Sequence, residues 1–223
     1  MLAKRKQTKM KGWRKCKFKG CGKQFEKQRP LQSTCCVQCA IKHSKDLKAA
    51  KESKDWKVKR AVMKDNITTL ADYKSMLQVI VNRIARTIDH DQPCISCGNT
   101  NPVKYDAGHR FTTKAHGNIR FNLFNIFRQC SKNCNVSLGG NPDGYDEGLE
   151  NTFGSGLFEY VKFDLKKDYP ILKASREDVK EAIKRAKEFE RTLTKEKQGT
   201  RDRIELRIAA NDFIGLYEQK KND

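Results

Sequence analysis

The clearest alternation of apolar and polar positions lies between residues 68 and 90. Apolar side chains recur there at three- and four-residue intervals, the spacing of one face of an α-helix. The members of this face are Leu70, Tyr73, Leu77, Ile80, Val81, Ile84 and Ile88. Thr68 or Thr69 is placed to cap the first turn. We therefore expect an amphipathic helix that packs on a neighbouring module.

Three further helices are expected after residue 150. The first is short, covers 157–165 and ends near Pro170. The second begins at Ser175, where the sequence Ser-Arg-Glu-Asp places a carboxylate three residues after a hydroxyl, and it runs to about Leu193. The third, 201–217, is amphipathic, so it should dock either on the core of the same chain or on a second subunit.

The remaining stretches are poor in apolar periodicity. Residues 41–67 are rich in lysine and prone to helix, with a weak apolar stripe, which is typical of a linker helix or an arm that tracks DNA. Residues 90–150 carry cysteines, histidines and glycines, so loops and short strands that bear a site are expected there. We predict an α+β chain with an N-terminal module (1–40), a basic helical arm (41–67), a helix with a central core (68–150) and a C-terminal helical region (151–223).

Charge indicates the class of partner. The net charge is +20, and residues 1–60 hold 20 Lys and Arg against four acids. Such a field favours a polyanion, because each neutralised phosphate releases counterions. Membrane surfaces attract basic segments too, but no apolar run is long enough to span a bilayer, and we expect no membrane partner. The basic start lacks a secretory signal, so we expect a reduced, intracellular chain whose cysteines bind zinc.

The nine cysteines fall into two clusters. Cys94-x2-Cys97 and Cys130-x3-Cys134 are separated by a 32-residue insert. Two close thiolate pairs joined by a loop are what a tetrahedral zinc site requires. This spacing predicts a structural Zn²⁺ that staples the central core.

The N-terminal cluster predicts a second zinc site. Its candidate ligands are Cys16, Cys21, Cys36 and Cys39. Cys35 is either spare or a substitute for Cys36, and His43 is close enough in sequence to compete as a ligand. Residues 1–40 hold few large apolar side chains, so a metal would supply stability that burial cannot. We expect a small module that faces DNA or packs on the chain.

Candidate chemistry lies between and beside the central cysteine pairs. Asp106 and the amide oxygen of Asn135 are hard ligands suited to Mg²⁺ or Mn²⁺. His109 is of the type that takes a proton from an attacking water. The structural alternatives are that Asp106 caps a turn, His109 packs in the interior and Asn135 bonds backbone in the zinc knuckle. We expect His90 and His116 to be exposed polar residues, with His116 in a loop that could meet DNA.

Other residues of this region could contact nucleic acid. Four basic side chains are candidates for phosphate contacts, with solvated surface charge as the alternative. They are Arg110, Lys114, Arg120 and Arg128. The glycines between residues 139 and 156 would permit close approach of nucleic acid to the backbone, or would serve ordinary tight turns.

The order Cys-x2-Cys, Asp-x-x-His, Cys-x3-Cys-Asn resembles the zinc-stapled HNH nucleases, most closely the phage endonuclease VII type, over about residues 90 to 145. The resemblance implies a ββα-metal (His-Me finger) core in which the four central cysteines hold a structural zinc. It further implies that Asp106 and Asn135 hold a separate catalytic cation and that His109 is the general base. Asn125 matches the middle Asn of HNH motifs, which holds the catalytic histidine in orientation.

Nearly the whole chain, from its basic cysteine-rich start to the segments Asp106-Ala107-Gly108-His109 and Gln129-Cys130, resembles the lambdoid phage NinG (Rap) recombination family. That resemblance implies binding and resolution of branched DNA such as Holliday junctions and D-loops. We accordingly expect a structure-selective, metal-dependent DNA endonuclease in the host cytoplasm, associated with the nucleoid. Its expected partners are branched or duplex DNA, a phage recombinase and a second copy of the chain, because a four-way junction has near two-fold symmetry.

Two other classes of function fit part of the pattern. One is a non-catalytic zinc protein that binds or anneals DNA junctions. The other is a zinc protein that binds RNA or regulates transcription. A simple zinc ribbon needs neither the Asp106 and His109 pair nor Asn135, which favours the nuclease.

Overall fold

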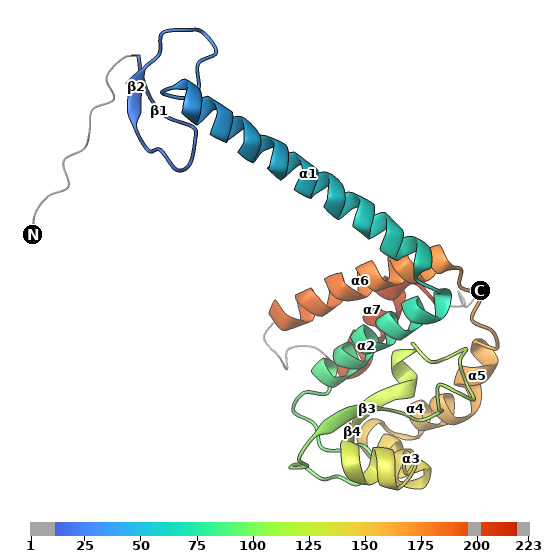
Figure 1. The fold of residues 1–223 in the computed structure, drawn as a ribbon. Coiled ribbons are helices and arrows are strands. Elements are labelled where there is room, and N and C mark those ends of the chain that lie inside the picture. The colour runs from blue at the N-terminus through green and yellow to red at the C-terminus, as the bar shows by residue number, and fades with distance from the viewer. Residues whose placement is uncertain (1–11, 196–201, 218–223) are drawn as a thin grey trace, which may run out of the picture. The chain divides into compact units, whose positions relative to one another are not determined.

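Short hairpins and longer helices alternate along the chain in the computed structural model, which describes residues 12–195 and 202–217 (Figure 1). The chain is α+β, as predicted. It divides into two units that meet between Ile67 and Thr68. The predicted N-terminal module and the predicted tail helix both start in segments that lie outside the described residues.

The first unit consists of one hairpin and one helix. Strands β1 (Trp13–Lys15) and β2 (Gln24–Glu26) pair antiparallel. Helix α1 (Val37–Ile67) follows and contains no buried residue. Between residues 12 and 67 the buried apolar residues are Phe25 and Cys16, which is too little apolar surface to hold a fold of this size without a metal.

The second unit begins with α2 (Leu70–Ile88), the helix that the apolar spacing predicts. Thr69 caps it: its hydroxyl accepts the backbone N–H of Asp72 at 3.2 Å, while the Asp72 carboxylate accepts the Thr69 N–H at 2.9 Å. Leu77, Ile80, Val81 and Ile84 on the predicted face are buried. The prediction of this helix and of its cap is confirmed.

A second hairpin forms the centre of this unit. Strands β3 (Tyr105–His109) and β4 (Ile126–Cys130) pair antiparallel, and the single turn η1 (Leu123–Asn125) leads into β4. The π-helical segment η2 (Ser131–Ser137) follows β4 directly, and α3 (Pro142–Phe153) comes after it. The expectation of short strands in this region is confirmed.

Helical segments complete the chain. The predicted helix over 157–165 is drawn out into three short pieces: α4 (Ser155–Glu159), the π-helical η3 (Tyr160–Asp164) and α5 (Leu165–Asp168). The two predicted helices after it are present as α6 (Arg176–Lys195) and α7 (Arg203–Ile214). Among the described helices, none combines the length and the apolar character that a membrane crossing would need.

The caps of the last two helices follow their sequences. Ser175 and Asp178 exchange backbone and side-chain hydrogen bonds at 3.2 and 2.8 Å, which is the capping box predicted for α6. The Asp202 carboxylate accepts the N–H of Ile204 at 2.7 Å at the start of α7. Gly215, with φ of 71°, ends α7 in the left-handed conformation that glycine adopts readily.

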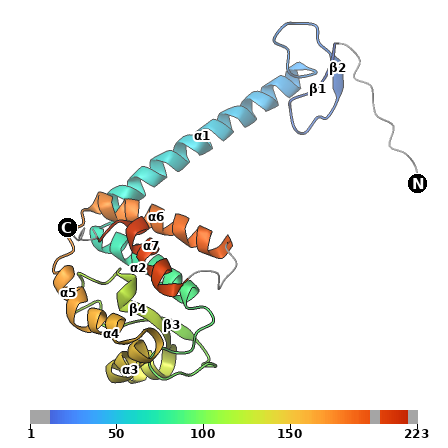
Figure 2. The same cartoon turned by 180° about the vertical axis from the view of Figure 1, so that it is seen from behind.

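The β3–β4 hairpin lies between two apolar clusters, with α2 on one side and α3 on the other (Figures 1 and 2). Ala107 and Ile126 pack into a core built with α2, α6 and α7. Phe127, the next residue on β4, packs on the opposite side with Tyr145 and Leu149, because successive side chains of a strand alternate. Helices after residue 150 therefore complete the core started before it, so residues 68–150 and 151–223 form one unit, and the tail helix docks on its own chain.

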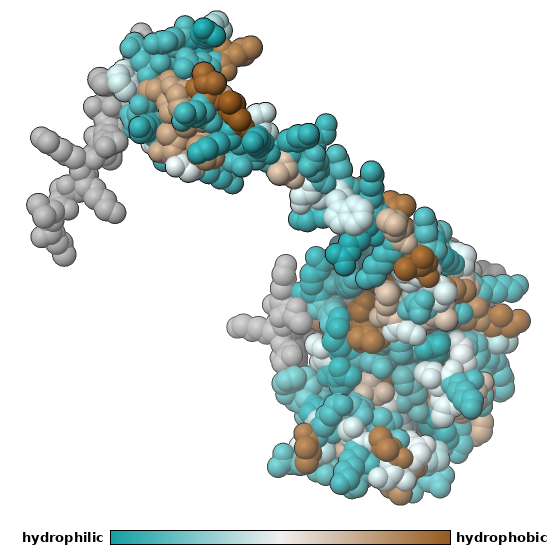
Figure 3. Space-filling model, viewed as in Figure 1, coloured by the Kyte–Doolittle hydropathy of each residue, from teal (hydrophilic) through white to brown (hydrophobic). Residues whose placement is uncertain are grey.

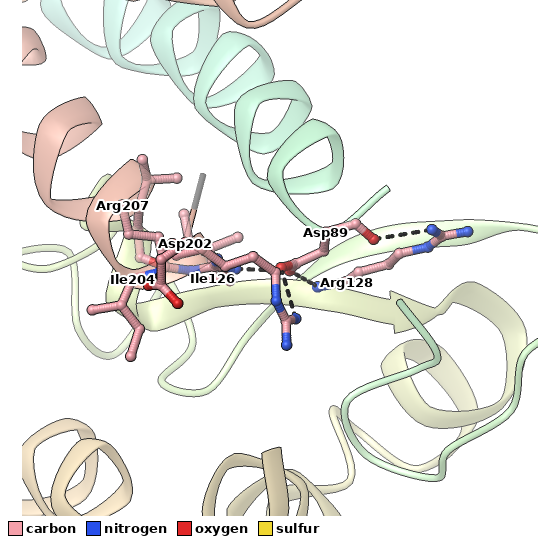
Figure 4. A network of polar contacts seen from close by, with 8 residues as sticks. Asp89, Ile126, Arg128, Asp202, Ile204 and Arg207 are labelled. Atoms are coloured by element: carbon pink, nitrogen blue, oxygen red, sulfur yellow. Dashed lines mark hydrogen bonds and ion pairs between the residues drawn. The ribbon is translucent and has the colours of Figure 1, made fainter. Parts of the chain in front are cut away.

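A buried ionic network fixes α7 to the hairpin (Figure 4). Arg207 is fully buried, and its guanidinium lies 2.7 Å from the carboxylate of Asp89 at the end of α2. The same guanidinium donates to the carbonyl of Leu123 at 3.2 Å and lies 4.0 Å from the centre of the Phe127 ring. Asp89 also accepts the backbone N–H of Arg128 at 3.0 Å. Both buried charges are therefore paired, which their removal from water demands.

Candidate functional site

The four central cysteines converge at the end of the hairpin. Their sulfurs all lie within 4.8 Å of one another, and the Sγ atoms of Cys97 and Cys130 are 3.7 Å apart. A tetrahedral zinc with Zn–S bonds of about 2.3 Å separates its sulfurs by about 3.8 Å. The Cys94 sulfur accepts the N–H of Cys130 at 3.2 Å, and the Cys130 sulfur accepts the N–H of Cys134 at 3.5 Å. The arrangement fits a structural zinc, as predicted.

The N-terminal cluster uses Cys35 where we expected Cys36. The sulfurs of Cys16, Cys21, Cys35 and Cys39 lie within 4.8 Å of one another. Cys35 is 3.5 Å from Cys21 and 3.6 Å from Cys39. Cys36 is exposed at the residue before α1, and hydrogen bonding from the Cys39 backbone lowers the pKa of its thiol. The Cys36 thiol also interacts with the sulfurs of Cys39 and Cys35, but it is not one of the four sulfurs that lie within 4.8 Å of one another. His43 is not part of this cluster.

Asp106 and Asn135 meet beside the central cysteine cluster. Asp106 stands on β3 and Asn135 on η2, the segment that starts where β4 ends. The Asp106 carboxylate accepts from the Asn135 amide at 3.1 Å and from the Ser131 hydroxyl at 2.5 Å, and the Lys104 ammonium is 3.2 Å away. Burial raises the pKa of Asp106, but these hydrogen bonds and Lys104 outweigh it and lower the pKa overall. The carboxylate is therefore ionised at neutral pH.

The oxygens of this corner fit a small divalent cation. If the Asn135 amide is rotated by half a turn, its oxygen takes the place of its nitrogen and lies beside the Asp106 carboxylate, so that both residues offer an oxygen to a cation. Gln129, opposite Asp106 in the hairpin, is fully buried, and within the described residues its Oε1 has no hydrogen-bond partner. Its Nε2 donates to the carbonyl of Gly140 and to the hydroxyl of Ser96, both at 2.6 Å, which fixes the orientation of the amide. This oxygen lies against Gly108, where a Cβ would come within 2.3 Å of it, so the glycine makes room for the Gln129 amide.

His109 lies away from this corner. It stands three residues after Asp106 on the same strand, so the two side chains point to opposite faces. Its Nε2 is 3.1 Å from the carbonyl oxygen of Arg120 and 3.1 Å from the amide nitrogen of Gln78 on α2. Burial lowers the pKa of His109 to about 4, against the opposing effect of the carbonyls of Arg120 and Ala107. The ring is neutral at physiological pH, as a base must be, and the residue is partly exposed.

Asn125 holds the loop that follows His109. It is fully buried, and its side chain accepts the N–H of Phe111 at 2.8 Å and donates to the carbonyl of Phe111 at 3.0 Å. Its own carbonyl accepts the N–H of Arg110 at 2.9 Å. Asn125 thus pins the backbone two residues beyond His109 and does not contact the ring by these bonds.

The four basic residues proposed for phosphate contacts differ in their surroundings. Arg110 is paired with Asp146 on α3, and its side chain is 14% exposed. Arg120 donates to the amide oxygen of Gln78 at 3.0 Å, and Arg128 stacks 3.5 Å over the Tyr105 ring. Lys114 is exposed. The three arginines would have to give up these contacts to bind a phosphate, whereas Lys114 is already exposed to solvent.

The two remaining histidines lie in different settings. His90 is exposed, as predicted, and contacts Asp91. His116 is half-buried with its ring edge-on to Phe111 at 5.1 Å, which differs from the expected exposed position. Sequence reasoning also assigned no role to Ser131 and Gln129, although both lie within three residues of a zinc ligand.

Two of the glycines serve packing. Gly144 and Gly148 lie one turn apart on α3, and each faces the backbone of the turn between Cys94 and Cys97. A Cβ at either position would overlap a carbonyl oxygen of that turn. The glycines therefore allow α3 to approach the zinc knuckle closely, and they do so at the four-residue spacing of one helix face.

Comparison with known proteins gives a family match over most of the chain. A family model described as Bacteriophage Lambda NinG protein matches residues 8–196. The protein ninG of Salmonella phage P22 is 31% identical over 168 residues, which cover 69% of this chain and 82% of that protein. The protein ninG of Escherichia phage lambda is 34% identical over 163 residues, covering 67% and 79% of the two chains. No solved structure matches this chain.

Proposed function

The chain belongs to the bacteriophage lambda NinG protein family, and we propose that it acts as a metal-dependent endonuclease on branched DNA such as Holliday junctions and D-loops. The observation that carries the proposal is the pairing of Asp106 with Asn135. A carboxylate from a strand and an amide from the helical segment after the hairpin meet next to a cysteine tetrad. This is the ligand arrangement that the HNH resemblance implies.

In this proposal the two kinds of metal have separate tasks. The cysteine tetrads hold Zn²⁺, which fixes the end of β4 and the start of η2 and so positions Asn135 one residue after Cys134. Asp106 and Asn135 would hold Mg²⁺ or Mn²⁺, and waters and phosphate oxygens would fill its remaining positions. When bound, that cation would stabilise the negative charge that develops on the scissile phosphate and the leaving oxygen.

His109 is the proposed general base. Its low pKa keeps the imidazole neutral at pH 7, so one ring nitrogen is free to accept a proton. The role requires the ring to exchange its contacts with Arg120 and Gln78 for the attacking water. His109 is the last residue of β3, where the paired strand gives way to a loop, and Asn125 holds that loop from the other side.

The substrate class follows from the family and the charge. A net charge of +20 favours binding through the phosphate backbone, with little direct reading of bases. Paired cuts across a four-way junction need two active sites, so we propose that the protein acts on DNA as a homodimer in the host cytoplasm.

The decisive test is cleavage of a labelled four-way junction, against linear duplex, with Mg²⁺ or Mn²⁺. Wild type, Asp106→Asn and His109→Gln are compared with the matched control Asp143→Asn, which changes an exposed carboxylate on α3. We expect wild type and the control to cut, and the other two variants to bind the junction, retain zinc and not cut. Equal cutting by Asp106→Asn and wild type would refute the metal site.

A second candidate function is supported by the position of His109. A partly buried ring on the strand face opposite Asp106, beside the carbonyl of Arg120, is also what a purely structural histidine would show. The alternative is a non-catalytic protein that binds branched DNA through its two zinc modules. Binding without cutting by every variant, wild type included, would favour it.

A further inference from the structure

Helix α1 carries an unusual row of basic residues. They occur at every third position and are Lys42, Lys45, Lys48, Lys51, Lys54, Lys57 and Arg60. An α-helix turns by about 100° and rises about 1.5 Å per residue, so each step of three moves the row back by about 60° and up by about 4.5 Å. The row therefore winds once around the helix over about 27 Å. Lys42 and Arg60 lie on one side, and Lys51 lies on the opposite side.

Within its own unit, most of the surface of α1 is exposed to solvent. Every residue from Ser44 to Lys64 is exposed, and the helix contains no buried residue. Figure 3 shows hydrophilic residues along it, with apolar ones scattered between them. Trp56, which stands between Lys54 and Lys57 of the row, is 58% exposed. A helix without a packed face is not explained by the core of its own unit.

Acids compensate only part of the row, because Asp46, Glu52 and Asp55 stand four positions after Lys42, Lys48 and Lys51, while the other four members have no acid at that spacing. Like charges three or four positions apart repel each other on a helix surface, and successive members of this row are such neighbours. Stabilising pairs of the kind formed by Lys48 and Glu52, 4.0 Å apart, are the arrangement that helix stability alone would favour. The repulsion is relieved when anions lie beside the lysines, which points to a polyanion as the ligand of α1.

We infer that α1 lies between two duplex segments of a branched DNA and contacts phosphates on its opposite sides. A helix that rests on a single duplex needs positive charge on one side only. Because the row winds fully around α1, it places positive charge on the sides that face each of the two duplex segments. This inference rests on the branched-DNA substrate of the proposed function and does not depend on cleavage.

The test uses three double variants of the full-length protein. They are Lys42→Gln/Lys45→Gln, Lys48→Gln/Lys51→Gln and Lys54→Gln/Lys57→Gln, each of which removes two charges from a different third of the circumference. Glutamine has a helix propensity close to that of lysine, so α1 is kept. The matched control, Lys184→Gln/Lys187→Gln, removes two charges from α6, where Lys184 is 73% exposed.

Binding is measured by fluorescence anisotropy of a labelled four-way junction, a linear duplex and a single-stranded RNA over a range of salt concentrations. The buffer contains Ca²⁺ as the divalent cation. It contains no chelator, because a chelator would remove zinc from the cysteine clusters. Each neutralised phosphate contributes about 0.9 to the slope of log K against log salt. We expect each of the three double variants to reduce the junction slope by about 2. On linear duplex one double variant should lose more affinity than the other two, and the α6 control should match wild type on both DNAs.

Four results would overturn the inference. Loss confined to one double variant on the junction would mean contact on one side. Equal loss by all three on linear duplex would place α1 in a groove of one duplex. No loss in any of them would exclude α1 from the interface, and preference for single-stranded RNA over the junction would identify another ligand. These binding results do not depend on cleavage, so they can be interpreted even if the protein does not cut the junction.

Discussion

Replacement of Gly148 by alanine tests the packing of α3 on the zinc knuckle. A Cβ at this position would lie 2.8 Å from the carbonyl carbon of Ile95 and closer still to its oxygen. Ile95 is poorly placed to retreat, because its N–H donates to the carbonyl of Arg128 at 3.0 Å and Cys94 precedes it. Helix α3 must therefore shift away from the knuckle.

The magnitude is set by two opposing effects. Alanine in a helix interior is about 0.5–1 kcal/mol more stable than glycine. Overpacking costs about 1–3 kcal/mol, and a clash with constrained backbone lies at the upper end. We expect Gly148→Ala to lose about 2 kcal/mol net. Gly156 on α4 has no atom within 4 Å of its Cβ position, so Gly156→Ala should gain about 0.5 kcal/mol or more and is the matched control.

The assay is thermal unfolding followed by circular dichroism, with zinc in the buffer and zinc content checked for both variants. A difference of 1 kcal/mol shifts the midpoint of a domain of this size by about 2–4 °C, so the two variants should differ by roughly 5–10 °C. If Gly148→Ala melts with Gly156→Ala or above it, α3 does not contact the knuckle as described.

Three further predictions concern the core, the zinc ligands and His109. Arg207→Met removes the nearer of the two ion-pair partners of the buried Asp89 carboxylate and leaves Arg203 at 3.4 Å, so it should lower the free energy of unfolding by about 3 kcal/mol in denaturant titrations. Arg207→Met combined with Asp89→Asn should recover much of this loss, and an unchanged single variant would contradict the network in Figure 4. Cys35→Ser should lose one of two bound zinc ions by metal analysis and Cys36→Ser should lose none, and the reverse result would restore Cys36 as the ligand. Burial lowers the pKa of His109 from 6.5 to about 4, so between these pH values the unfolded chain binds more protons than the folded one, and the free energy of unfolding should fall as the pH drops. His109→Gln should remove up to about 3 kcal/mol of this pH dependence. Equal pH profiles of the unfolding free energy for wild type and His109→Gln would show that the ring is solvated.

Several features of this protein were predictable because their causes are local in the chain. The helix of residues 70–88 follows from the three- and four-residue spacing of its apolar side chains, and the capping boxes at Thr69 and Ser175 need only residues three positions apart. The central zinc tetrad follows from two close cysteine pairs. Asn135 adjoins Cys134, so it lies near the tetrad in any fold that closes the staple.

Tertiary structure decided what depends on direction and on distant neighbours. Whether Cys35 or Cys36 joins the N-terminal cluster depends on where the fold places their sulfurs, and it is Cys35 that lies within 4.8 Å of the other three. The separation of His109 from Asp106 depends on their sharing one continuous strand, which converts a three-residue spacing into opposite faces. The orientation of the Gln129 amide depends on the carbonyl of Gly140, eleven residues later, which accepts from its nitrogen, while the amide oxygen has no partner among the described residues. A sequence pattern specifies which side chains share a face, but the faces that meet are chosen by the packing of the whole unit.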